Sequence, residues 1–104
     1  MTKADQVTTV DEARAPRIQL SDGFSAPAEW VECIRLHIVG RLAALQRDRT
    51  YTAKKLAGRD YWGSLSSGEQ RLAGRCIAHL VSHGELPLVF VRGKHEYPLR
   101  YRLK

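Results

Sequence analysis

Three side chains with metal-binding chemistry lie close together in the second half of the chain. Cys76, His79 and His83 follow the spacing C-x-x-H-x-x-x-H, which on a helix could bring a thiolate and two imidazoles to one metal ion. Cys76 falls on the apolar side of this segment, however, and no fourth ligand is signalled. His37 and His95 are single histidines with no partner that the sequence identifies. We therefore expect no metal site.

Motifs for covalent or phosphate chemistry are weaker still. No catalytic order of Ser, His and Asp residues and no pair of carboxylates typical of acid–base catalysis stands out. The run GSLSSGEQ (63–70) lacks the lysine and the preceding strand of a phosphate-binding loop. The sequence therefore predicts that the protein is not an enzyme and has no cofactor.

The chain is basic, which is common among small proteins. The chain has 17 Lys and Arg against 11 Asp and Glu, a formal net charge of +6, and an isoelectric point of about 9.7. Residues 1–25 hold three basic and four acidic side chains, so residues 26–104 carry +7. A surface field of this sign favours a polyanionic partner.

Length and cysteine content limit the class of protein. A chain of 104 residues suits one domain. Cys33 and Cys76 fall in separate predicted helices without paired spacing, which makes a disulfide framework improbable. No apolar run of about 18 residues and no basic-then-apolar leader is present, so we expect a cytoplasmic protein.

The first part of the chain divides into an arm and a long helix. Residues 1–24 have no sustained period and are predicted to be a mobile arm, although Ile18 and Leu20 could dock on the domain at 25–104. A helix is expected from about 26 to 47, with Ser25 as its N-cap. Its core-facing stripe is formed by Trp30, Val31, Ile34, Ile38, Leu42 and Leu45.

A second apolar strip lies on or near the opposite side of this helix. It consists of Leu36, Val39, Gly40 and Ala43. Either the strip packs against the N-terminal arm or a neighbouring element, or it forms a homodimer contact.

Two further helices are expected, separated by an aromatic turn. Thr52 can cap a short helix that Gly58 ends, and residues 59–65 are predicted to be a turn whose Tyr61 and Trp62 cover the core. The capping box S-x-x-E at 66–69 begins a helix at about 67–83, and Gly84 stops it. Its apolar side holds Leu72, Ala73, Cys76, Ile77, Leu80 and Val81, its opposite side holds Arg71, Arg75, Ala78 and Ser82, and His79 lies at the edge of the exposed face.

The end of the chain predicts a β-hairpin. Residues 86–92 are rich in β-branched and aromatic types, 93–96 form a turn, and 97–104 alternate. Tyr97, Leu99, Tyr101 and Leu103 share one face, and Arg100, Arg102 and Lys104 share the other. Pro98 indicates an edge strand or a site on an unpaired side.

This order of elements resembles the winged helix-turn-helix superfamily over roughly residues 27–104. The segments that carry the resemblance are YTAKKLAG (51–58), LSSGEQRLAGRCIAHLVSHGELP (65–87) and LVFVRGKHEYPLRYRLK (88–104). The resemblance implies an α+β fold, a three-helix winged-helix-like domain with a C-terminal β-hairpin. The turn from Gly58 to Leu65 is longer than the turn of about three or four residues in simple helix-turn-helix proteins.

The same resemblance assigns nucleic-acid contacts. It places the helix at 67–83 in the major groove, with Arg71, Arg75 and His79 toward base edges. The hairpin at 86–104 becomes a basic wing. Phosphate contacts would come from Lys54, Lys55, Arg92, Lys94, His95, Arg100 and Arg102.

The predicted function is therefore DNA binding, as a small transcriptional regulator or an accessory factor. The alternative is a protein-interaction module that binds a protein partner or self-associates through the helix at 26–47. RNA binding is a third possibility, with Tyr97 and Tyr101 as candidate stacking residues.

Overall fold

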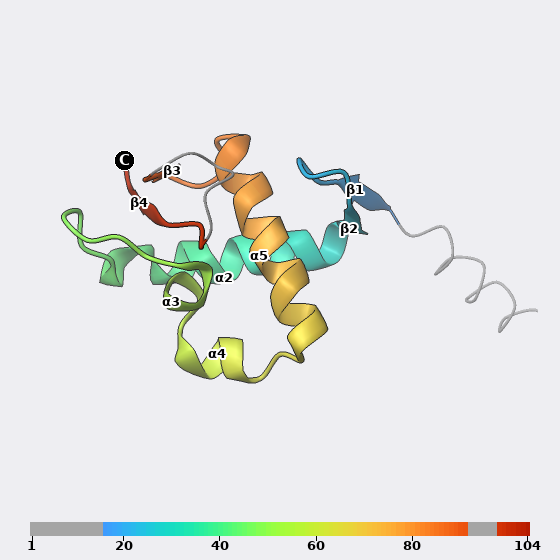
Figure 1. Cartoon of the computed structure of the whole chain (residues 1–104), viewed down its shortest axis with the longest axis horizontal. Coiled ribbons are helices and arrows are strands. Elements are labelled where there is room, and N and C mark those ends of the chain that lie inside the picture. The colour runs from blue at the N-terminus through green and yellow to red at the C-terminus, as the bar shows by residue number, and fades with distance from the viewer. Residues whose placement is uncertain (1–15, 92–97) are drawn as a thin grey trace, which may run out of the picture.

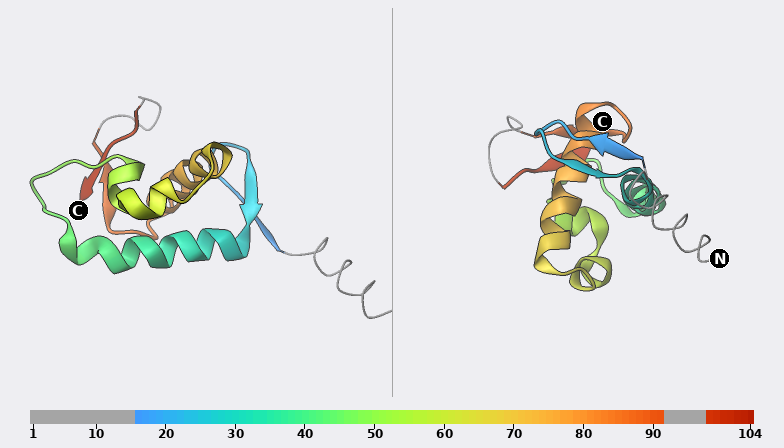
Figure 2. Two further views of the ribbon diagram at one scale, coloured as in Figure 1. Left: turned by 90° about the horizontal axis from the view of Figure 1, so that it is seen from below. Right: turned by 90° about the vertical axis from the view of Figure 1, so that its right-hand side faces the viewer.

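Two crossing helices form the centre of the molecule, with a small antiparallel hairpin on either side of the second one (Figure 1 and Figure 2). The computed structural model describes residues 16–91 and 98–104. It confirms the predicted α+β class. The elements are β1 (Arg17–Gln19), β2 (Ser25–Pro27), α2 (Ala28–Arg41), the 3-10 turn η1 (Leu42–Ala44), α3 (Ala53–Ala57), α4 (Arg59–Gly63), α5 (Ser67–Ser82), β3 (Leu88–Phe90) and β4 (Tyr101–Leu103).

Helix α2 is shorter than the predicted span of 26–47. It begins at Ala28, with Pro27 rather than Ser25 at the N-cap. The expected Ser25 cap is wrong because Ser25 pairs with Gln19 in the β1–β2 hairpin, which commits this residue to a strand. The chain leaves the α-helix after Arg41 through η1.

The predicted core stripe of this helix is confirmed. Val31, Ile34 and Ile38 are buried, and Trp30, Leu42 and Leu45 pack against the core as partly buried side chains.

The β1–β2 hairpin crosses the boundary predicted at residue 24. Its turn is closed by the Leu20 N–H donating to the Phe24 carbonyl at 2.6 Å and by Gly23 at a φ of +90°. Leu20 is 2% exposed and belongs to the core, and Ile18 packs on it. Docking of Ile18 and Leu20 is therefore confirmed, and residues 16–24 are part of the folded domain. The remainder of the predicted arm, residues 1–15, lies outside the described residues.

Helices α3 and α4 form a bent pair. The Thr52 hydroxyl accepts the Lys55 N–H at 3.4 Å at the start of α3, and Gly58 ends it with a φ of +93°, as predicted. The expectation of a turn over 59–65 is wrong in part, because residues 59–63 form α4. Gly58 redirects the chain, and its carbonyl then accepts the Trp62 N–H of a new helix. Tyr61 and Trp62 of α4 are half-buried against the core, as expected.

Helix α5 follows its sequence signals closely. The Ser66 hydroxyl accepts the Glu69 N–H, and the Glu69 carboxylate accepts the Ser66 N–H, so the capping box is confirmed. Gly84 follows the helix with a φ of +71°. The predicted apolar side is buried, except that Leu72 is partly exposed. His79 departs from prediction, since it is only 6% exposed.

The C-terminal hairpin is confirmed within the described residues. Strands β3 and β4 pair antiparallel, with Val89 opposite Arg102. Tyr101 is 1% exposed and also pairs on its other side with Tyr51, through N–H to carbonyl bonds of 2.7 and 2.8 Å. Strand β4 is therefore not an edge at Tyr101, and Pro98 precedes the paired residues. The predicted turn and Tyr97 lie outside the described residues.

The part of the chain that the structure describes contains no helix long and apolar enough to cross a bilayer. Cys33 is exposed and Cys76 is buried, and both are free thiols.

Candidate nucleic-acid interface

A cleft of about 1050 Å³ runs along the outward face of α5. Its floor is made by α5, where the small residues Gly74 and Ala78 lie between longer side chains. One wall comes from the start of α3 and from the β3–β4 hairpin, including Phe90, and the other comes from the β1–β2 loop (Ser21–Phe24). The cleft therefore joins α5 to segments that lie far apart in the sequence.

Three Lys and Arg side chains from two helices line this cleft, and His79 of α5 lines it as well. Lys54 comes from α3, and Arg71 and Arg75 come from successive turns of α5. Lys54 and Arg71 are exposed and make no ion pair with any described residue. Asp22 is the one acidic residue among the described residues of the lining, so the cleft has a positive balance.

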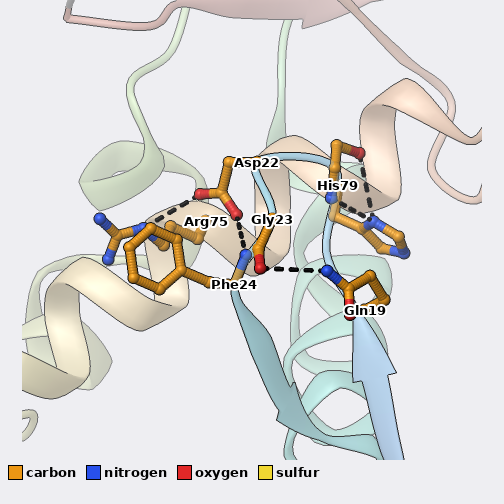
Figure 3. A network of polar contacts seen from close by, with 7 residues as sticks. Gln19, Asp22, Gly23, Phe24, Arg75 and His79 are labelled. Carbon is orange, nitrogen blue, oxygen red and sulfur yellow. Dashed lines mark hydrogen bonds and ion pairs between the residues drawn. The ribbon is translucent and has the colours of Figure 1, made fainter.

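Arg75 is not the freely solvated side chain that the sequence suggests. Its Nε donates to Asp22 Oδ2 at 3.0 Å, and its guanidinium carbon lies 3.9 Å from the centre of the Phe24 ring (Figure 3). The Arg75 side chain is still 37% exposed. It lies in the cleft with its direction set by the β1–β2 loop.

The β1–β2 loop is itself fastened to α5 through His79. The Ser21 N–H donates to His79 Nδ1 at 3.1 Å, with the Ser21 hydroxyl at 3.2 Å from the same atom (Figure 3). Burial, and then the neighbouring His83, lowers the pKa of His79. Both effects favour the neutral ring that this contact requires.

The expectation that His79 faces base edges is therefore corrected. Its ring lies under the loop, with Nδ1 occupied, because the hairpin that the sequence did not reveal covers this part of α5.

The position of α3 is set by α2. Arg41 Nε donates to the Leu56 carbonyl at 2.7 Å, and His37 Nε2 lies 2.7 Å from the Ala57 carbonyl. These contacts satisfy carbonyls that the end of a helix leaves without intrahelical partners. Gly58 is favoured here by its φ of +93°, and a Cβ atom at this position would also lie 2.9 Å from the Arg41 guanidinium, which would have to shift. The sequence predicts that the helix ends at Gly58. That prediction could have indicated that the last carbonyls of the helix need donors from elsewhere in the chain.

Comparison with known proteins identifies a family. Residues 37–102 match a family model described as a domain of unknown function, DUF1413. The chain belongs to the DUF1413 family. No curated protein and no solved structure matches the chain. The matched segment of the DUF1413 protein contains Lys54, Arg71 and Arg75, whereas the β1–β2 hairpin with Asp22 and Phe24 lies before it.

Several predicted contact residues of the DUF1413 protein lie away from the cleft. Lys55, Arg100 and Arg102 are exposed but do not line it. Arg100 and Arg102 lie on the face of the hairpin opposite the buried Tyr101, as the alternation predicts. The remaining hairpin candidates, Arg92, Lys94 and His95, lie outside the described residues.

The second strip of α2 is exposed in the DUF1413 protein. Leu36 is 54% exposed and Val39 is 41% exposed, and Gly40 and Ala43 beside them are also exposed. Of the two expectations for this strip, packing against the N-terminal arm or a neighbouring element is not found among the described residues, and residues 1–15 of the arm lie outside them.

The possible metal ligands have other contacts. Cys76 is fully buried, which raises the pKa of its thiol to about 11, and His79 Nδ1 is occupied by Ser21. Among residues 16–91 and 98–104, no group of three or more His, Cys, Asp or Glu side chains is arranged to hold a metal ion.

Proposed function

We propose that this DUF1413 protein is a winged-helix DNA-binding module, with α5 in the major groove and the β3–β4 hairpin as its wing. The observation that carries the proposal is the cleft, where Lys54, Arg71 and Arg75 converge and Asp22, the one acidic residue among the described residues of its lining, is paired with Arg75. Phosphates attract such a cluster, and arginine donors suit guanine acceptors.

The arrangement of elements supports this proposal. The order α2, α3, α5 and hairpin is that of the winged helix-turn-helix proteins that the sequence resembles. The extra length between α3 and α5 is taken up by α4, whose Trp62 packs on the core. The insertion therefore forms a compact corner between the two helices.

A salt titration on duplex DNA tests the proposal. Fluorescence anisotropy with a labelled pool of random duplexes should detect binding at about 50 mM salt that weakens steeply by about 200 mM. Replacing both Arg71 and Arg75 by alanine should weaken binding about tenfold or more and reduce the slope of log K against log salt by about one to two units.

The matched control removes two positive charges outside the cleft. Arg35 lies on α2, paired with Glu32, and Arg49 lies in the loop after α2. The double variant Arg35→Ala, Arg49→Ala should retain most of the affinity. Absence of duplex binding by the wild-type protein at low salt would overturn the proposed function.

A second candidate function is favoured by the exposed strip on α2. We propose as the alternative that Leu36 and Val39, both large and exposed, bind a protein partner or a second copy of the chain. Sedimentation or light scattering on wild type and Leu36→Asp tests this. Loss of an assembly in the variant, together with no nucleic-acid binding by wild type, would select this function over DNA binding.

A further inference from the structure

Arg75 and Arg71 lie one helical turn apart on the same face of α5, but they are held differently. Arg71 is exposed and makes no ion pair within the described part of the chain. Arg75 is held from two sides, by the Asp22 carboxylate at Nε and by the Phe24 ring over its guanidinium. Among the described residues, the cleft therefore contains one arginine that is free to move and one that is ion-paired and held in place.

The contact with Asp22 uses only one edge of the Arg75 guanidinium. The bonded nitrogen is Nε, and the two terminal nitrogens point away from Asp22 (Figure 3). Neither terminal nitrogen is hydrogen-bonded to a described residue. Because a guanidinium has five donors in a rigid plane, the free edge can still make a two-pronged contact with a pair of acceptors.

The nearby carboxylate decides which acceptors suit this edge. Asp22 lies 3.0 Å from Nε, so it largely cancels the charge of Arg75 and repels a phosphate that approaches it. The O6 and N7 atoms of guanine are uncharged acceptors, and they match the spacing of an arginine fork. A neutralised but directed guanidinium therefore favours a guanine edge over the DNA backbone.

The loop that carries Asp22 is well braced. Asp22 Oδ1 accepts the Phe24 N–H at 3.1 Å, Gln19 Nε2 donates to the Gly23 carbonyl at 3.0 Å, and the loop is bonded to His79 (Figure 3). Arginine loses considerable rotamer freedom when it is fixed in a complex. Here the loop fixes it before the partner arrives.

We infer that Asp22 and Phe24 are positioning residues that direct Arg75 to the O6 and N7 atoms of a guanine in the major groove, whereas Arg71 contributes mainly to salt-dependent affinity. This inference rests on the proposed DNA-binding function. It adds the base that is recognised and the part played by the β1–β2 loop, which lies outside the segment that matches the DUF1413 family.

The experiment has two stages. Duplexes with a random core are first selected on wild-type protein, and the selected sites are expected to contain a preferred guanine. That guanine is then replaced by 7-deazaguanine, which keeps Watson–Crick pairing but lacks the N7 acceptor. Wild-type affinity should fall about tenfold, and the Arg75→Ala variant should show less than about a twofold difference between the two duplexes.

The positioning role is tested with Asp22→Asn and Phe24→Leu. In both variants the penalty for 7-deazaguanine should shrink to about threefold or less, and in Asp22→Asn the salt dependence should steepen because the charge of Arg75 is no longer cancelled. Asp48→Asn makes the same charge change at an exposed residue that does not line the cleft. This control should keep the full tenfold penalty. Thermal unfolding of each variant verifies that the domain is folded.

The outcomes separate the two proposals. If wild type binds duplex DNA but Asp22→Asn and Phe24→Leu keep the guanine preference and the full penalty, the positioning role is wrong and the DNA-binding function stands. Tighter binding of all duplexes by Asp22→Asn with an unchanged preference would also overturn it, since Asp22 would then only block Arg75. If wild type binds no duplex at low salt, both proposals fail.

Discussion

The two hairpins that border α5 are joined to the rest of the molecule by different kinds of contact. The β3–β4 hairpin inserts the ring of Tyr101 into the core and is bonded on its other side to Tyr51. The β1–β2 hairpin buries Leu20, but its loop is attached to α5 mainly by polar contacts, from Ser21 to His79 and from Asp22 to Arg75. One hairpin therefore chiefly supports the core, and the other chiefly arranges the site.

The largest expected effect is on the hairpin that supports the core. Tyr101→Ala should lower the free energy of unfolding by about 3–5 kcal/mol, because it leaves a cavity the size of an aromatic ring beside Phe90 in the core. Urea denaturation followed by circular dichroism measures this change. Arg102→Ala, on the exposed side of the same strand, should stay within about 0.5 kcal/mol of wild type. A loss below about 1 kcal/mol in Tyr101→Ala would contradict the role of this hairpin.

Removal of a buried side chain from the β1–β2 hairpin should lower the free energy of unfolding by less. Leu20→Ala should cost about 2–3 kcal/mol, at the lower end of the range for buried leucines, because the site lies at the end of the core and can partly collapse. The same denaturation experiment applies, with Ser25→Ala in the exposed part of β2 as the control. If Leu20→Ala lowered the free energy of unfolding no more than Ser25→Ala does, β1–β2 would contribute nothing to the core.

The polar attachment of β1–β2 should also be sensitive to pH. The pKa of His79 is lowered in the folded protein by burial and by His83, so the unfolded chain binds more protons at this residue. Stability from neutral His79 is fully present above about pH 6.5 and declines as the pH falls below it. Denaturation curves between about pH 7.5 and 5 should therefore show that the free energy of unfolding falls more steeply with decreasing pH in wild type than in His79→Asn. Equal slopes would show that His79 does not couple the hairpin to proton binding.

Asp22 should contribute least to stability. The side chains of Asp22 and Arg75 are 40% and 37% exposed, and ion pairs at such sites contribute about 0.2–1 kcal/mol. Asp22→Asn should therefore change the free energy of unfolding by no more than about 1 kcal/mol while changing guanine preference severalfold. A loss as large as that of Leu20→Ala would mean that Asp22 serves the fold.

The sequence predicts those parts of the molecule that depend on neighbouring residues. The capping box at Ser66 and Glu69, the cap at Thr52 and the stop at Gly58 are contacts across three or four residues, and each is found in the structure. The apolar stripes of α2 and α5 and the alternation of β4 are also local patterns, and they correctly predict the core and the face that carries Arg100 and Arg102.

Tertiary structure alone decided how the cleft is arranged. The ion pair of Arg75 joins residues 53 positions apart, and the contact of His79 joins residues 58 positions apart. No local pattern indicates such contacts, and strands of three residues are too short for a clear alternation, so the sequence predicts an arm where the structure has β1–β2. The sequence determined that Arg71 and Arg75 share the outward face of a capped helix, because helical periodicity is local. Only the folded chain, by laying Asp22 and Phe24 against one of them, made the two arginines chemically different.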